Sequence, residues 1–246
     1  MQKRFAEEKA EIQKNKKENI ESKIGRILFR EELFTPEAAE RYVFPFEQSG
    51  YLSAEQKLEL LLYETEKRRR KGEDVCLLTE LGRKKTVITE ETVTELYLKW
   101  RRECRCFFSW EEKRVILVRR LASRIWAGGL GILLRIGGDA IEIGTYVTTK
   151  NKEENIGVRK GDKTFRFPFL SVSSEEETER IVRNLISREL HGEITVQNPL
   201  WCHERPDGTR LYATRPPASP HWGMKIIFGN GRRAEWDDRE NRFCGL

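Results

Sequence analysis

Residues 198–217 read NPLWCHERPDGTRLYATRPP, and this stretch decides how the second half of the chain folds. Its centre, Pro206-Asp207-Gly208, is typical of a tight turn: proline presets φ, aspartate bonds to the following backbone, and glycine accepts a positive φ. Strand-forming residues flank the turn at 200–204 and 211–214. The sequence therefore predicts an antiparallel hairpin, which the rigid pair Pro216-Pro217 ends.

Two arginines, Arg210 and Arg215, flank the second strand of this hairpin. Guanidinium groups near a sheet edge can bind phosphate through paired hydrogen bonds. The bland alternative is that both are ordinary surface residues of a strand, and the pattern alone leaves both readings open.

Working outward, the neighbouring segments predict more strands and one long helix. A second hairpin is expected from Asn155–Arg159 and Thr164–Phe169, joined by Gly161-Asp162. Ser173 or Ser174 caps a helix that begins at Glu175 and ends at His191-Gly192, because its apolar residues recur at helical spacing. Further short strands are expected at Ile141–Thr149, Ile194–Val196 and Met224–Phe228.

Upstream of Gly128 the pattern is helical. Ser53 is a candidate N-cap, and Ser109 with Glu112 forms a capping box ahead of a broad apolar face. We therefore expect an α+β protein: a helical N-terminal half, then an antiparallel-sheet domain with one long packed helix. The expected divisions are a solvated helix at 1–24, a helical region at 25–127, the α+β domain at 128–228, and a linker or tail at 229–246.

Composition indicates a soluble, intracellular globular protein. The chain has 246 residues, of which 35% are charged, and a net charge of only +6. No apolar core follows the basic N-terminus as in an export signal, and the longest apolar run, Ile125–Leu134, is half of the about twenty residues that a membrane span needs. Five cysteines, an odd number, are expected to be reduced.

Motifs for independent chemistry are weak. The nearest match to a phosphate-binding loop, Gly157–Thr164, has one residue too few between its glycines, and Asp162 stands before the lysine. Cys104 and Cys106 on a helix would point about 200° apart, and Cys202 and His203 face opposite ways on a strand. We predict no catalytic residue, no metal site and no cofactor bound by these residues alone.

Basic runs at Lys67–Lys71, Gly82–Lys85 and Arg101-Arg102 raise a different possibility, a nucleic-acid-binding protein. Such binding would weaken steeply with salt. Acidic residues interleave with these runs, and aromatic residues do not alternate with them as a stacking surface requires. Nucleic acid is therefore the second expectation for a partner.

Residues 129–228 resemble the N-terminal domain of the type II/type IV secretion ATPases, of the tight-adherence pilus and conjugation motor type. Gly129-Leu-Gly131 resembles the entry motif of that domain, without its proline. The most specific match is Pro206-Asp207-Gly208-Thr209-Arg210 followed by Pro216-Pro217. In the family the last strand ends in Ile-Arg-Lys and leads to a RecA-like motor, whereas here Lys225–Phe228 takes that place.

The resemblance implies a cap domain that powers no reaction by itself. Its motor would bind ATP and Mg²⁺ and drive protein or pilus export, and we expect only the front part of such an ATPase here. Arg210, and secondarily Arg215, would contact phosphate, while Gly129, Gly131, Pro206, Asp207, Gly208, Pro216 and Pro217 would be structural. Implied partners are further copies in a hexamer, the motor, and the inner-membrane platform, at the cytoplasmic face of the membrane.

Overall fold

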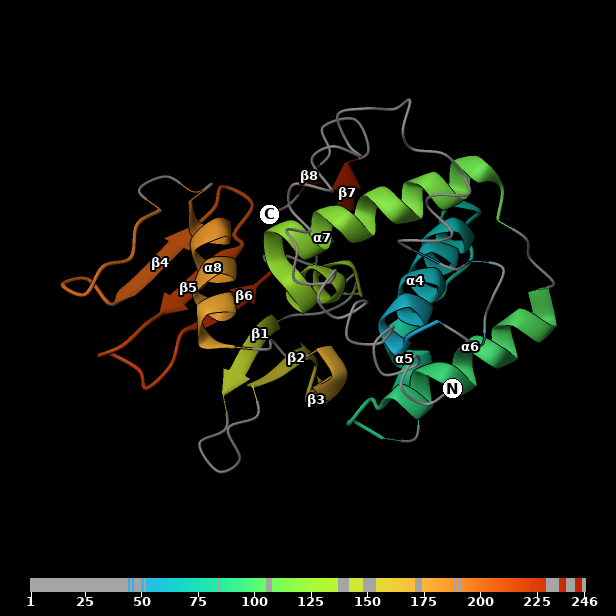
Figure 1. The fold of residues 1–246 in the computed structure, drawn as a ribbon, viewed down its shortest axis with the longest axis horizontal. Coiled ribbons are helices and arrows are strands. Elements are labelled where there is room, and N and C mark those ends of the chain that lie inside the picture. The colour runs from blue at the N-terminus through green and yellow to red at the C-terminus, as the bar shows by residue number, and fades with distance from the viewer. Residues whose placement is uncertain are drawn as a thin grey trace, which may run out of the picture. The chain divides into compact units, whose positions relative to one another are not determined.

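The computed structural model describes Phe44, Phe46, Gly50 and residues 52–83, 85–104, 108–136, 142–147, 154–170, 174–187, 189, 192–228, 235–237 and 242–244 (Figure 1). The chain divides into two compact units, Met1–Ser49 and Gly50–Leu246. In the first unit the rings of Phe44 and Phe46 stack with centroids 4.3 Å apart. The helix predicted for residues 1–24 lies outside the described residues.

The second unit begins with helices, as the sequence predicts. They are α4 (Ala54–Arg70), α5 (Leu77–Leu81), α6 (Glu90–Cys104) and α7 (Trp110–Ile136). Ser53 caps α4 in a reciprocal box with Gln56, and Ser109 and Glu112 make the predicted box at the start of α7. In each box two side-chain oxygens accept hydrogen bonds from two backbone N–H groups at the helix start, where such groups have no intrahelical acceptor.

Helix α7 does not end near residue 127, where the sequence pattern changes. It bends at Gly128, whose φ of 53° and ψ of −138° suit glycine, and then continues to Ile136. The segment after the bend packs closely, because a Cβ on Gly131 would lie 2.9 Å from the Cβ of Ser123. The sequence pattern predicts that the helix ends at these glycines. Instead, Gly128 bends the helix into an elbow and Gly131 allows the two helical segments to pack closely.

The sheet follows, with six strands in the order β3-β2-β1-β6-β5-β4, all antiparallel to their neighbours. The strands are β1 (Glu142–Val147), β2 (Glu154–Lys160), β3 (Lys163–Arg166), β4 (Leu200–Glu204), β5 (Arg210–Thr214) and β6 (Gly223–Ile227). Both predicted hairpins, β2–β3 and β4–β5, are confirmed. A short 3₁₀ turn, η3 (Pro168–Leu170), follows β3.

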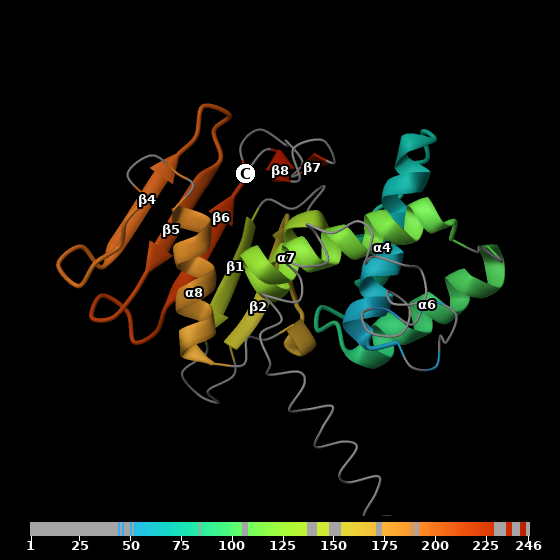
Figure 2. The same ribbon diagram turned by 45° about the horizontal axis from the view of Figure 1, so that its top comes forward.

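One long helix, α8 (Glu175–Ile186), packs on the sheet (Figure 2). Ser174 caps it as predicted, but it ends before His191, because Glu189 and Gly192 already make turn hydrogen bonds at 2.9 and 3.0 Å. Residues 193–196 are not a strand, so that prediction is wrong. Alternation along β5 and β6 buries Leu211, Ala213, Met224 and Ile226 and turns the residues between them to the opposite face.

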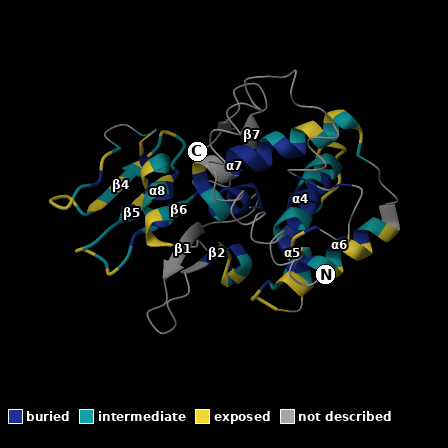
Figure 3. Ribbon diagram, in the orientation of Figure 1, coloured by how far each residue is buried: buried dark blue, intermediate teal, exposed yellow. Residues whose placement is uncertain are grey.

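The architecture is therefore α+β, helices first and antiparallel sheet second, as expected from the sequence. Figure 3 shows buried residues along α4, α5 and the part of α7 beside its bend. Within the range predicted as a linker or tail, β7 (Glu235–Asp237) and β8 (Arg242–Cys244) form a two-stranded antiparallel sheet. No helix in the described ranges is long and apolar enough to cross a membrane.

Candidate functional site: the Pro-Asp-Gly turn and the double-proline loop

The turn between β4 and β5 is closed by its own residues. The Asp207 carboxylate accepts a hydrogen bond from the backbone N–H of Thr209 at 2.8 Å, and Gly208 takes a φ of 82°. Arg205 and Thr209 bond across the base of the turn at 2.9 Å, and Thr209 is fully buried. The local chemistry of Pro206-Asp207-Gly208 thus fixes where β5 begins and hence where Arg210 stands.

Arg210 is exposed on the face of the sheet away from α8. It lies directly opposite Glu204 on β4, and its Nε donates to a Glu204 carboxylate oxygen at 2.9 Å. This hydrogen bond, together with the Glu204 charge, raises the pKa of Arg210. Both side chains are more than half exposed, so water screens the pair and either partner can exchange for another.

Arg215 has a different setting, at the other end of β5. Its backbone N–H bonds to the carbonyl of Pro199 at 3.0 Å, and its Nε donates to the carbonyl of Pro216 at 3.2 Å. The guanidinium carbon lies 4.7 Å from the centroid of Trp222, which is 3% exposed. Pro216 and Pro217 are joined by a cis peptide bond. Arg215 is thus positioned by the double-proline loop and by stacking on the indole.

Trp222 also contacts a second arginine, which the sequence analysis missed. The guanidinium carbon of Arg183, on α8, lies 4.9 Å from the centroid of the same ring. Arg183 Nε donates to Glu179 at 2.7 Å. In the sequence, the i, i+4 spacing of Glu179 and Arg183 indicates an ion pair on one helix face, but it does not reveal the contact with Trp222.

The two predicted phosphate-contact residues are not brought together. Arg210 begins β5 and Arg215 follows its last residue, and five residues of extended strand span about 17 Å. A single phosphate group cannot bridge that separation. The residue near Arg215 in space is Arg183 rather than Arg210.

A further polar cluster lies beside the turn and was also missed. Glu189, just after α8, accepts two hydrogen bonds from Arg205, one of them from Nε at 3.1 Å. His203 Nε2 lies 3.5 Å from the same carboxylate. Glu189 and Arg205 are about nine-tenths buried, so this ion pair ties the region after α8 to the hairpin.

The predicted structural glycines, Gly129 and Gly131, lie in α7 just beyond its bend. A Cβ at Gly129 would meet the carbonyl oxygen of Leu170 at 2.4 Å, so η3 lies against the elbow there. Gly131 faces Ser123 in the segment before the bend. Both glycines therefore serve close packing, where a larger residue would force the backbone apart.

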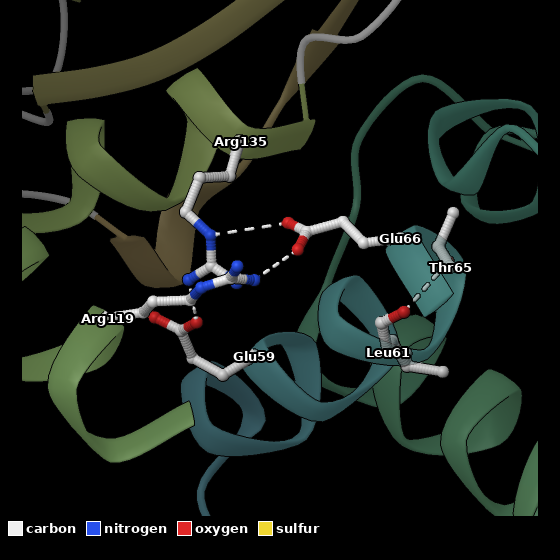
Figure 4. Close-up of polar contacts among 6 residues, drawn as sticks. All are labelled: Glu59, Leu61, Thr65, Glu66, Arg119 and Arg135. Carbon is white, nitrogen blue, oxygen red and sulfur yellow. Dashed lines mark hydrogen bonds and ion pairs between the residues drawn. The ribbon is translucent and has the colours of Figure 1, made fainter. Parts of the chain in front are cut away.

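Charged residues are buried between α4 and α7, as Figure 4 shows. Arg135, beyond the elbow, pairs with Glu59 and lies 3.6 Å from Glu66, while Arg119, before the elbow, pairs with the same Glu66. The Arg119, Arg135 and Glu59 side chains are at most 1% exposed. Burial works to lower the pKa of Arg135, but the two carboxylates outweigh it and raise that pKa.

The segments considered as a phosphate-binding loop or a metal site have ordinary structural roles. Gly157–Thr164 forms the β2–β3 hairpin, and Gly161 takes a φ of 61° at its turn. Cys202 is an exposed free thiol, and Trp201 stacks on His203 at 5.9 Å on the opposite face of β4. In the described part of the chain, which omits Cys106 and the Cys104 side chain, no group of three His, Cys, Asp or Glu residues could hold a metal ion.

Comparison with known proteins identifies no relative of this chain. No model of a known protein family matches the chain, and no curated protein matches it.

Proposed function

We propose that this chain is the N-terminal cap and interaction part of a type II/IV secretion ATPase, which powers protein or pilus export. ATP and Mg²⁺ would bind to a motor domain, whose Walker pattern the 246 residues do not contain. The cap would work at the cytoplasmic face of the membrane, in a ring of six copies beside an inner-membrane platform. By itself the chain would not hydrolyse ATP.

One observation carries the proposal: the segment that resembles the family folds as one unit with an arginine presented at its turn. The Pro206-Asp207-Gly208 turn, strand β5 and the Pro216-Pro217 loop are consecutive and rigidly hydrogen-bonded. Arg210 stands at the start of that unit, exposed, with an exposed carboxylate as its partner. A phosphate group makes stronger paired hydrogen bonds with guanidinium than this screened ion pair, so Arg210 can exchange Glu204 for phosphate.

The chemical role of Arg210 would be electrostatic. When the cap closes over nucleotide held by the motor, a guanidinium at the cleft would offset the charge that develops on the transferred phosphate. Arg215, stacked on Trp222, would be a second cationic contact from the far end of β5. The separation of the two arginines means that they would reach different phosphate groups or different neighbouring subunits.

The test begins with the DNA around the coding sequence, where we expect a frame encoding G-x-x-x-x-G-K-[S/T]. That motor is coexpressed with the chain, and ATP hydrolysis and particle mass are measured. We expect a hexameric complex, and at least tenfold slower hydrolysis with Arg210→Ala. Arg159→Ala, an exposed arginine elsewhere in the same sheet, is the control and should keep full activity. A motor that neither binds the chain nor changes its rate contradicts the proposal.

A further inference from the structure

The C-terminal ends of α4 and α6 and the start of α7 lie on one side of the helical half, away from the sheet (Figures 1 and 2). Lys67 near the end of α4 pairs with Glu112 in the first turn of α7 at 2.6 Å. Phe108, just before α7, has its ring 5.9 Å from Tyr63 and 6.1 Å from Trp100. Since only residues 105–107 separate α6 from Phe108, the last Cα of α6 is within about 14 Å of the Cα of Phe108. We call residues 67–74, 98–104 and 108–114 the basic end.

The basic end holds most of the excess charge of the protein. Its three segments contain ten Lys or Arg and five Asp or Glu, a formal net charge of +5, against +6 for all 246 residues. Five of those cations are exposed, Arg70, Lys71, Lys99, Arg102 and Arg114, against three exposed acids among its described residues, Glu73, Asp74 and Glu111. Runs that are separate and interleaved with acids in the sequence therefore become one electropositive surface in space.

Ion pairs within the basic end do not cancel this surface. Lys67 pairs with the part-buried Glu112, and Arg68 pairs with Glu73 at 2.6 Å in a more exposed and weaker pair; neither ion pair changes the net charge. A polyanion competes for such cations by releasing its own condensed counterions. The charge that matters for a long-range partner is the net +5, not the pairing of any single side chain.

We propose that the basic end binds double-stranded nucleic acid through its phosphate backbone, without sequence preference. The inference is independent of the role proposed for Arg210. A phosphate backbone offers a regular line of anions, and cations from three different helices can contact several of them at once.

The aromatic residues at the basic end favour a duplex over a single strand. Single strands bind where bases can stack on exposed rings. Tyr63, Trp100 and Phe108 pack instead on one another, and Trp100 is only 7% exposed. Trp110, at the start of α7, is only partly exposed, so the surface offers contacts to phosphate groups rather than a row of stacking rings.

A membrane surface fits less well. Peripheral helices bind lipid through an apolar face next to their cations. Among the described residues of the basic end, Leu98, at 48% exposed, is the one strongly exposed large aliphatic side chain. One such side chain adds little to electrostatic attraction, so the observations favour nucleic acid.

The experiment measures anisotropy of a fluorescein-labelled 20-base-pair DNA of mixed sequence with the full chain between 50 and 200 mM NaCl. With about four phosphate contacts, log affinity should fall with log salt at a slope near −3.6, a loss of roughly 150-fold over this range. The test variant, Lys71→Gln/Arg102→Gln/Arg114→Gln, removes one exposed cation from the C-cap of α4, one from α6 and one from α7. Its slope should be shallower by about 3, and its affinity at 100 mM NaCl at least tenfold lower.

Two matched variants keep the outcome unambiguous. Arg159→Gln/Lys163→Gln/Arg166→Gln removes three exposed cations from β2 and β3 and should bind as the unchanged chain does. Lys71→Arg/Arg102→Lys/Arg114→Lys keeps the charge and should also retain binding. Equal losses in both glutamine variants would mean that net charge alone acts, and would overturn the site. Absence of binding at 50 mM NaCl, tighter binding of a single-stranded 20-mer, or preferential binding of phosphatidylserine-containing vesicles would each overturn the proposal.

Discussion

The guanidinium of Arg135 pairs with the carboxylate of Glu59 in the interior, where the two side chains are 1% and 0% exposed. Glu59 lies in α4, and Arg135 lies beyond the bend of α7. Arg119, before the bend, pairs with Glu66, which lies about two turns further along the same face of α4. The two segments of the elbow are thus both paired with carboxylates of α4.

The first prediction concerns this pair. Glu59→Gln should lower the free energy of unfolding by about 3–5 kcal/mol, because it leaves a buried guanidinium without its principal counter-charge. Urea unfolding at pH 7, followed by circular dichroism, measures the change. Glu204→Gln, which removes a carboxylate from an exposed pair, is the control and should leave the unfolding midpoint unchanged.

A paired replacement separates charge from packing. Glu59→Leu/Arg135→Met should be considerably more stable than either single variant, because the double change leaves no unpaired charge from this pair. If the double variant loses the sum of the two single effects, the residues act independently, and the pair does not hold the elbow.

The second prediction concerns the bend itself. Gly128→Ala should cost about 2 kcal/mol or more, because its backbone angles strain any other residue and the new Cβ would lie 2.7 Å from Cδ1 of Ile181. Gly161→Ala, also at a positive φ but with open space around it, should cost less. Thermal unfolding compares them. Adding Ile181→Val to Gly128→Ala should recover part of the loss, and no recovery would mean that the contact is not the cause.

The local signals in the sequence predicted most elements because each depends on a few adjacent residues. The capping serines Ser53, Ser109 and Ser174 each begin a helix, and the Gly161-Asp162 and Pro206–Gly208 turns join the predicted strands. The predicted helix boundaries were wrong where tertiary packing determines where a helix ends. Helix α7 continues past Gly128 because Gly131 allows a close approach to Ser123, which is visible only when both segments are in place.

The sequence predicted where the arginines of the candidate site stand along the chain, but not which side chains they contact. The two predicted arginines stand at the ends of β5, as the strand pattern indicates. That Arg215 shares Trp222 with Arg183 depends on how α8 lies on the sheet, about which the sequence of either segment says nothing. The buried pair left a trace, since Glu59 interrupts the leucines 58–62 and Arg135 closes the apolar run 125–134.

The third prediction is a pH dependence at Glu64. Burial raises the pKa of this carboxyl above its usual value, and Glu112 adds to the effect, while Lys67, Lys71 and Arg68 act against it. Its Oε2 is buried and makes no hydrogen bond within the described part of the chain. Because the folded state prefers the protonated form, Glu64 lowers stability once pH rises from about 4.5 through the folded pKa.

Glu64→Gln should therefore be more stable than the unchanged chain at pH 7, and the difference should shrink as pH falls from the folded pKa of Glu64 toward about 4.5. Urea unfolding of both proteins at pH 7, 5.5 and 4 measures it. Taking the difference between the two proteins removes the opposite contribution of groups such as Glu112, whose pKa is lowered. A difference that does not vary with pH would show that the two side chains differ in packing only.

The last prediction concerns the two arginines on Trp222. Each cation over the indole should contribute about 0.5–1 kcal/mol, since Arg183 is 45% exposed and its charge is partly screened. Arg183→Gln and Arg215→Gln should each lower the free energy of unfolding by that amount. The double variant should lose more than the sum, because each single variant also relieves the repulsion between two like charges that lie within 5 Å of one ring centroid. Urea unfolding of the four proteins closes the cycle, and Trp222→Phe supplies the control, since a weaker ring should shrink both single effects. Losses that add fully would mean that the two cations do not interact through this ring.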